Sequence, residues 1–158
     1  MTKETGIKTI ATNRKAHHDY FIEETYEAGI VLTGTEIKSV RNGQVNLRDS
    51  FAMIKEGEMW LMNAHIATYK QGTYANHEPR RQRKLLMHRR EIDRMAAKLD
   101  QKGLTLVPLR LYMKDNRAKV ELGLARGKKQ YDKRATLREK ESQREIERTV
   151  AQRHKGSW

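Results

Sequence analysis

The segment LTLVPLRLYMKDNRAKVELGLA, residues 104–125, decides the fold. Apolar side chains recur at every second position in both of its halves, which is the pattern of β-strands that bury one face. The polar stretch 114–117 between the halves is typical of a turn. We therefore predict a β-hairpin with strands at 104–113 and 119–125. Its apolar faces are Val107, Leu109, Leu111 and Met113 on the first strand and Val120, Leu122 and Leu124 on the second. Pro108 lacks an amide hydrogen, so it suits an edge or a bulge.

Two further β-rich segments precede this hairpin. Residues 20–32, YFIEETYEAGIVL, are rich in β-branched and aromatic side chains. We predict that they form one long strand that bends near Ala28 and Gly29, where glycine relaxes the backbone. Residues 49–55 and 59–66 are predicted to form a second hairpin across an intervening Glu-Gly-Glu turn. The polar, aperiodic residues 67–83 are predicted to be a loop.

Two helices are predicted from capping residues and from apolar spacing. Thr33 and Glu36 match a capping box, which predicts a short helix over 35–42 that Gly43 ends. Within 85–102, apolar side chains recur at helical spacing, at Ile92, Met95, Ala96 and Leu99. This spacing predicts a second helix, which ends at Gly103.

The order of these elements favours antiparallel pairing, and a sheet this small must close or be covered to remove its edges. We therefore predict a mainly β fold, an OB-like antiparallel barrel with about three helices, because this barrel is common among oligonucleotide binders. The predicted organisation is a flexible N-terminus at 1–12, the barrel at 13–126 and a basic tail at 127–158.

The composition changes after Ala125. Residues 126–158 hold eleven Lys and Arg against five Asp and Glu, with few large aliphatic residues. Such a segment cannot offset its ordering entropy alone, so we predict a tail that is disordered when free. In a helical tail, one face would collect Lys133, Lys140, Arg144 and Arg148. Like charges at i,i+4 disfavour that helix in isolation, so we expect it to form against phosphate. The alternative is a solvated helix packed on the barrel.

The charge of the whole chain points to a polyanionic partner. There are 33 Lys and Arg against 20 Asp and Glu, a net charge of +13. Neutralised phosphates release counterions, so a clustered surplus of this size favours nucleic acid. A solvated basic surface is the alternative.

The sequence offers no constellation for catalysis. It contains no Cys, which excludes disulfides, Cys-based zinc sites and Cys nucleophiles, and fits a reducing cytosol. The six His lack metal-ligand spacing, and no Gly-rich phosphate loop is present. No segment is apolar enough to be a secretory signal or to span a membrane. We expect a cytoplasmic protein without enzymatic activity, cofactor, metal or membrane partner.

Two side chains suggest contacts with bases. Glu27 lies beside the predicted bend, where it could accept hydrogen bonds from a base amino group. Alternatively, it pairs with a neighbouring Lys or Arg. Tyr131 lies among basic residues and could stack on a base, or it could be exposed without a role.

Three segments together resemble the family of SsrA-binding proteins, also called small protein B. They are AGIVLTGTEIKSVRNGQVNLRDS at 28–50, RRQRKLLMHRREI at 80–92 and GLARGKKQYDKR at 123–134. The resemblance implies an OB-like barrel that binds the tRNA-like domain of transfer-messenger RNA (tmRNA, SsrA). It also implies delivery of that RNA to the A site of a stalled ribosome, where the tail becomes helical in the empty mRNA channel. Alanyl-tRNA synthetase and elongation factor Tu are implied as indirect partners.

The resemblance also implies roles for individual residues. The expected RNA contacts are Asn13, Glu27, Lys38, Arg41, Leu86, Lys119, Gly127, Lys128 and Lys129. The residues expected to act on the ribosome are Tyr131, Asp132, Lys133, Arg134, Lys140, Arg144 and Arg148. Other family members have His at the position of Tyr131. Stacking tolerates that change, whereas a role for a protonated imidazole does not.

Two other classes of function compete with this one. A generic single-strand binder would also be basic, but it should expose several aromatic side chains, and most of the ten aromatic residues here lie in strand patterns. A nuclease or RNA-modifying enzyme would need a metal cluster or a nucleophile. The RNA that copurifies with the protein would distinguish these classes.

Overall fold

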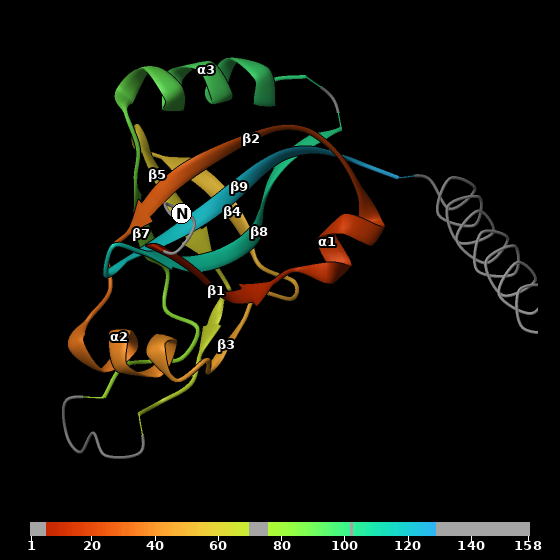
Figure 1. Ribbon diagram of the computed structural model, residues 1–158. Helices are drawn as coiled ribbons and strands as arrows, with labels where there is room; N and C mark the ends of the chain where they lie inside the picture. Colours follow the sequence, from red (N-terminus) through yellow and green to blue (C-terminus); the bar gives the residue numbers. More distant parts are fainter. Residues whose placement is uncertain (1–5, 70–75, 102, 129–158) are drawn as a thin grey trace, which may run out of the picture. The chain divides into compact units, whose positions relative to one another are not determined.

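The computed structural model describes residues 6–69, 76–101 and 103–128 (Figure 1). The helices in this part of the chain are α1 (Arg14–Asp19), α2 (Gly34–Arg41) and α3 (Arg89–Leu99). The strands are β1 (Ile7–Thr12), β2 (Tyr20–Ile30), β3 (Val45–Asn46), β4 (Phe51–Lys55), β5 (Glu58–Met62), β6 (His65–Ile66), β7 (Arg83–Leu86), β8 (Leu104–Lys114) and β9 (Arg117–Gly127).

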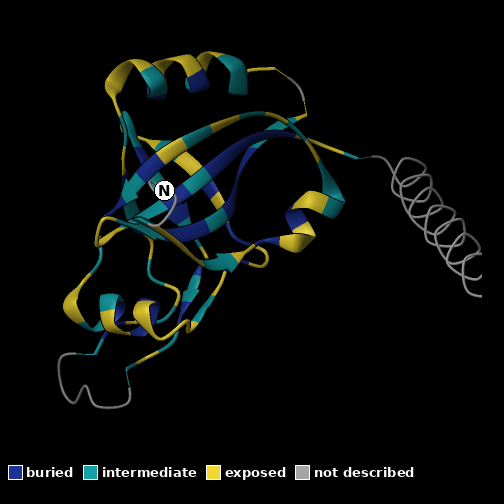
Figure 2. Ribbon diagram, in the orientation of Figure 1, coloured by how far each residue is buried: buried dark blue, intermediate teal, exposed yellow. Residues whose placement is uncertain are grey.

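Six strands close into an antiparallel ring in the order β8, β4, β5, β7, β2 and β9, with β9 pairing back to β8. Strand β1 adds to the second half of β8, and β3 pairs separately with β6. Many residues of the strands are buried, as the dark blue stretches of β8 and β9 show in Figure 2. The prediction of a mainly β, antiparallel barrel with about three helices is confirmed.

The hairpin of residues 104–125 forms as predicted and joins β8 to β9. Asp115 and Asn116 make the turn with positive φ angles of 50° and 64°, a conformation that these residue types tolerate well. The apolar face of β9 lies in the barrel core. The face of β8 is split by a bulge between Pro108 and Arg110, the kind of position expected for this proline. Because of the bulge, Val107 and Leu109 pack against α1 instead of the barrel core.

Strand β2 is as long as predicted, but its irregularity is elsewhere. The register shift lies between Ile22 and Glu24, not at Ala28 and Gly29. Gly29 lies opposite Leu86 on β7, and a Cβ at Gly29 would lie 3.4 Å from the Cβ of Leu86, which is an ordinary van der Waals contact.

Several boundaries differ from the prediction. Residues 7–12, expected to be flexible, form β1, because backbone pairing with β8 needs only a few apolar contacts. The strand predicted at 59–66 is interrupted by Asn63, whose φ angle is 63°. The helix predicted from residue 85 begins at Arg89, because Leu85 is buried in β7 between β5 and β2. Helix α1 was not located by the sequence pattern.

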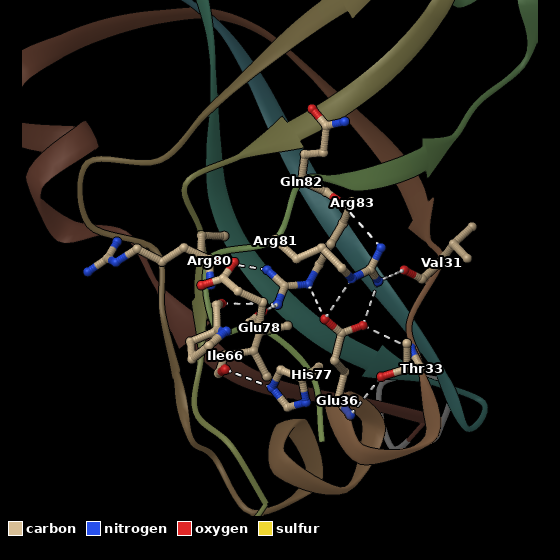
Figure 3. Close-up of polar contacts among 12 residues, drawn as sticks. Val31, Thr33, Glu36, Ile66, His77, Glu78, Arg80, Arg81, Gln82 and Arg83 are labelled. Atoms are coloured by element: carbon tan, nitrogen blue, oxygen red, sulfur yellow. Dashed lines mark hydrogen bonds and ion pairs between the residues drawn. The ribbon is translucent and has the colours of Figure 1, made fainter. Parts of the chain in front are cut away.

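A buried charge cluster holds α2 on the barrel (Figure 3). We call Glu36, Arg81 and Arg83 the Glu36 cluster. Arg83 donates from Nε to Glu36 at 2.7 Å, and Arg81 donates from Nη2 at 2.6 Å. The predicted capping box completes the set, because the Thr33 amide donates to Glu36 at 2.8 Å. Arg83 also donates to the carbonyls of Ala64 and Pro79.

These bonds determine the ionisation of Glu36. Burial alone would raise the pKa of its carboxyl, but the hydrogen bonds from Arg81, Thr33 and Arg83 outweigh burial and hold that pKa at about 2. His77 adds a further connection, with its ring nitrogens 2.9 Å from Thr35 Oγ1 and 2.8 Å from the Ile66 carbonyl oxygen. Helix α2 is therefore fixed to the 77–83 segment by polar contacts as well as by its apolar face.

Candidate nucleic-acid interface

A network of polar side chains crosses the outer faces of β2, β9 and β8. We call it the Glu27 network, and its members are Glu27, Arg110, Tyr112, Lys114, Lys119 and Glu121. The Tyr112 hydroxyl donates to Glu27 Oε2, and Lys114 Nζ lies 3.6 Å from the same oxygen. Glu121 faces Glu27 across the strand pair, and Arg110 Nε lies 3.4 Å from its carboxylate. Each acidic member therefore has its own basic or hydroxyl partner.

The network keeps Glu27 ionised. The hydrogen bond from Tyr112 lowers the pKa of Glu27 below its ordinary value, and Lys114 and Lys119 lower it further, against a smaller opposing effect of burial. Burial raises the pKa of Tyr112, so its hydroxyl stays protonated and donates. Glu27 therefore pairs with a neighbouring Lys, Lys114, which is one of the two alternatives considered for it. The carboxylate is still 42% exposed and can accept further hydrogen bonds.

An apolar groove lies beside this network, between β7, α2 and the β8–β9 turn. Its volume is 390 Å³. We call it the Leu86 groove; its wall and floor include Val31, Ile37, Val40 and Leu86, and Lys119 and Arg117 lie at its edge. Leu86 is 53% exposed and Val31 is 44% exposed. Two large exposed aliphatic side chains beside two cations form a surface suited to the apolar and charged parts of a nucleotide.

Helix α2 carries two of the expected RNA contacts, Arg41 and Lys38. Arg41 lines a second hollow, of 450 Å³, which shares Met113 and Asn116 with the Leu86 groove. Lys38 is exposed, and its ammonium lies 5.3 Å from the centre of the Tyr69 ring. The structure thus brings Glu27, Leu86, Lys119 and Arg41 into one region, with Lys38 on the same helix as Arg41.

Asn13 lies elsewhere and is buried. Its amide nitrogen donates to the carbonyls of Pro108 at 2.9 Å and Leu47 at 3.3 Å, and its side-chain oxygen accepts from the Ala16 amide. The bond from Ala16 caps α1, and the other two use both amide hydrogens within the fold. In this structure Asn13 shapes a surface instead of presenting its own side chain.

Gly127 lies in this second region too, and Lys128 directly follows it in the chain. Gly127 pairs with Tyr20, which lines a hollow together with Asn13. At the other end of β2, Gly29 pairs with Lys119. Eight residue steps of β9 lead from Lys119 to Gly127, so the two regions are up to about 26 Å apart at the usual strand rise. Lys129 and all the residues expected to act on the ribosome lie outside the described residues; those are Tyr131, Asp132, Lys133, Arg134, Lys140, Arg144 and Arg148.

The sequence pattern missed the members of the network on β8. Arg110, Tyr112 and Lys114 alternate along the strand, and this spacing places all three on its outer face. This polar row on β8 faces a second polar row on β9, which contains Lys119 and Glu121. Together the two rows could have indicated the network from the sequence. In the part of the chain that the structure describes, no group of three or more His, Cys, Asp or Glu could hold a metal ion. No helix among the described residues is long and apolar enough to cross a membrane.

Comparison with known proteins places these features among relatives. A family model described as SmpB protein matches residues 10–152. The SsrA-binding protein of Acidothermus cellulolyticus is 61% identical over 156 residues, which cover 99% of this chain and 98% of that protein. The SsrA-binding protein of Geobacillus kaustophilus is 62% identical over 155 residues, which cover 98% and 99% of the two chains.

A solved structure has the same fold. It is described as "tmRNA-SmpB: a journey to the center of the bacterial ribosome". The TM-score is 0.65 at 57% sequence identity, and the match covers 76% of this chain and 85% of that chain.

Proposed function

Because this chain belongs to the SmpB protein family, we propose that it is an RNA-binding protein of ribosome rescue that binds transfer-messenger RNA and acts with it at the ribosome in trans-translation. The observation that supports this most strongly is the extent of the family match, which runs from residue 10 to residue 152. It includes the barrel and most of the basic C-terminal segment. The net charge of +13 fits a large RNA partner.

The barrel binds the tRNA-like domain of the RNA in this proposal. Lys38, Arg41, Lys119, Lys128 and Lys129 contact phosphates, with Gly127 allowing close approach of the backbone. Leu86 packs against a base or ribose, and Glu27 accepts a hydrogen bond. Phosphate contacts position an RNA and give little sequence information, so recognition is mainly of shape. Asn13 contributes by fixing α1 against the loop at Leu47 and strand β8.

The tail acts on the ribosome in this proposal. Tyr131 stacks on a base, and Asp132, Lys133 and Arg134 support tagging. Lys140, Arg144 and Arg148 line the basic face of a helix in the empty mRNA channel. The support is the resemblance of 123–134 to the family motif and the family match up to residue 152. Replacing residues 132–134 by Ala should leave RNA affinity unchanged while abolishing tagging.

The wider assignment has the same basis. The chain has no enzymatic activity of its own and works in the cytoplasm, delivering the RNA to the A site of a stalled ribosome. Alanyl-tRNA synthetase and elongation factor Tu act on the same RNA and are indirect partners. The lack of Cys and of catalytic spacing in the sequence supports a binding role.

The RNA that copurifies with the protein tests this proposal. We expect one transfer-messenger species, and we expect the purified chain to bind that RNA more tightly than an unstructured RNA of equal length. Recovery of bulk single-stranded RNA with no such preference would instead indicate a generic single-strand binder.

A further inference from the structure

Among the described residues, the contacts to the Glu27 carboxylate are made at one of its oxygens, Oε2. The Tyr112 hydroxyl donates to Oε2, and Lys114 Nζ is nearest to that same oxygen. No described residue has a recorded hydrogen bond or ion pair to Oε1. The Glu27 side chain is 42% exposed, so the carboxylate lies at the protein surface. The carboxylate thus has one bound oxygen and one oxygen available to accept a hydrogen bond.

Tyr112 is itself fixed in place. It is only 3% exposed, although it belongs to a surface network. The guanidinium carbon of Arg110 lies 4.3 Å from the centre of its ring. Arg110 is restrained in turn, because its Nη1 donates to Thr9 Oγ1 at 3.3 Å and its Nε lies 3.4 Å from Glu121. The Tyr112 ring is therefore held in place by packing, and its hydroxyl reaches from β8 to Glu27 on β2.

The charged neighbours alone would not orient Glu27 in this way. Lys114 on β8 and Lys119 on β9 attract the carboxylate, while Glu121 on β9, which faces Glu27, repels it. An ammonium on a long side chain has no fixed direction. A phenol hydroxyl on a buried ring does have one, and a group held in its binding geometry loses less entropy when it binds.

We propose that Tyr112 is a positioning residue of the RNA interface, which orients the Glu27 carboxylate through Oε2 so that Oε1 accepts a hydrogen bond from the RNA. This inference rests on the proposed function and adds a residue to it. The matching donor is a base amino group or a ribose 2′-hydroxyl, because both donate to a carboxylate oxygen. Tyr112 acts through Glu27 and does not touch the RNA.

The test is the substitution Tyr112→Phe, which keeps the packed ring and removes the hydroxyl. We expect the affinity for transfer-messenger RNA to fall about tenfold, while the protein stays folded with a thermal transition only slightly lowered by the loss of one hydrogen bond. Tyr26→Phe is the matched control, because the Tyr26 hydroxyl donates to Glu24 Oε1 at 2.5 Å on the same strand. It removes an equivalent Tyr–Glu bond outside the network, so the affinity should not change. Equal affinity of Tyr112→Phe and wild type would overturn the inference.

A double-mutant cycle shows whether Tyr112 acts through Glu27. In the background of Glu27→Gln, we expect Tyr112→Phe to change the affinity less than about twofold. A full tenfold loss in that background would overturn the inference, because Tyr112 would then act on the RNA or on the fold directly.

A further measurement does not involve RNA. Titration of the Glu27 carboxyl carbon by NMR should give a pKa below the ordinary 4.5 in the wild type and in Tyr26→Phe. In Tyr112→Phe it should rise, because the largest lowering effect is removed. An unchanged pKa would overturn the inference. If the wild type bound no transfer-messenger RNA while this pKa rose as expected, the proposed function would fail although the Tyr112–Glu27 contact was real.

Discussion

Glu36 and Glu27 are ionised carboxylates in opposite surroundings. Glu36 is fully buried, and its two oxygens accept from Arg81, Arg83 and the Thr33 amide. The Glu27 side chain is 42% exposed, and the described residues contact one of its two oxygens. A fully bonded carboxylate can only stabilise the fold, whereas a half-bonded one at the surface can also accept from a ligand. The comparison predicts that damage to the Glu36 cluster lowers stability and that damage to the Glu27 network lowers RNA affinity.

The largest effect is expected for Arg83→Met. It removes a buried cation and leaves Glu36 and the carbonyls of Ala64 and Pro79 short of a donor. Loss of one partner from a buried pair costs about 3–5 kcal/mol. We expect the free energy of unfolding, measured in urea, to fall by that amount.

Arg81→Met is the matched control, because the Arg81 side chain is 35% exposed and water can replace its contacts. Its cost should not exceed about 2 kcal/mol. An equal loss in both variants would contradict the distinction between the buried and the exposed partner.

The next largest effect is expected from acid, which protonates Glu36 and so weakens the Glu36 cluster. The pKa of Glu36 is held at about 2 in the fold, below the ordinary value of 4.5. A carboxyl whose pKa is lower in the folded state than in the unfolded state stabilises the fold. This stabilisation is complete above the unfolded-state pKa and is lost as the pH falls through the folded-state pKa. We therefore expect unfolding free energy to decrease by about 3 kcal/mol between pH 5 and 2 from this group, at about 1.4 kcal/mol per unit. In Glu36→Gln this component of the pH dependence should be absent; an unchanged profile would show that other carboxyls cause it.

Lys119→Ala tests the other side of the comparison. It should reduce RNA affinity about tenfold and lower the slope of affinity against salt by about 1, because one phosphate contact is lost. Unfolding free energy should change by less than about 0.5 kcal/mol. Lys55→Ala is the control, because Lys55 lies on β4 outside both regions and its ammonium donates to Gln82. Equal losses of affinity in both variants would indicate that the overall positive charge of the protein, and not a specific contact of Lys119, determines the affinity for RNA.

The smallest effect is expected for Leu86→Ala. Because Leu86 is 53% exposed, its truncation should leave the thermal transition nearly unchanged. RNA affinity should fall about threefold to tenfold without a change in salt slope, since no charge is removed. A fall in stability instead of affinity would assign Leu86 to the barrel and not to the interface.

The same comparison indicates what the sequence could predict. The 104–125 hairpin and the Thr33–Glu36 capping box were predictable, because each depends on residues close together in the chain. Arg83 was assigned to a polar loop, because its partner Glu36 is 47 residues away and nothing local shows that it is buried. Tyr112 and Glu27 are 85 residues apart and meet only because the barrel closes.

Among the candidate site residues, the resemblance named Leu86, Lys119 and Glu27, which the fold brings together. It also named Asn13, whose amide the structure uses entirely within the fold. Without the resemblance, the sequence pointed to Glu27, through its place beside the predicted bend, but not to Asn13, Leu86 or Lys119. A proposed interface built from several separate elements has no period in the sequence.

Strand β9 has a mechanical consequence for the choice of RNA. It carries Lys119 near its start and Gly127 at its end, and it is clamped between β8 and β2 along this length. Eight residue steps of strand fix the distance between these two proposed contact points at up to about 26 Å. A folded RNA with contact groups at that spacing meets both points at once, without further ordering. A single strand must first be stretched and immobilised to match it. The fixed distance between Lys119 and Gly127 therefore favours a rigid, folded RNA over a flexible RNA of the same charge.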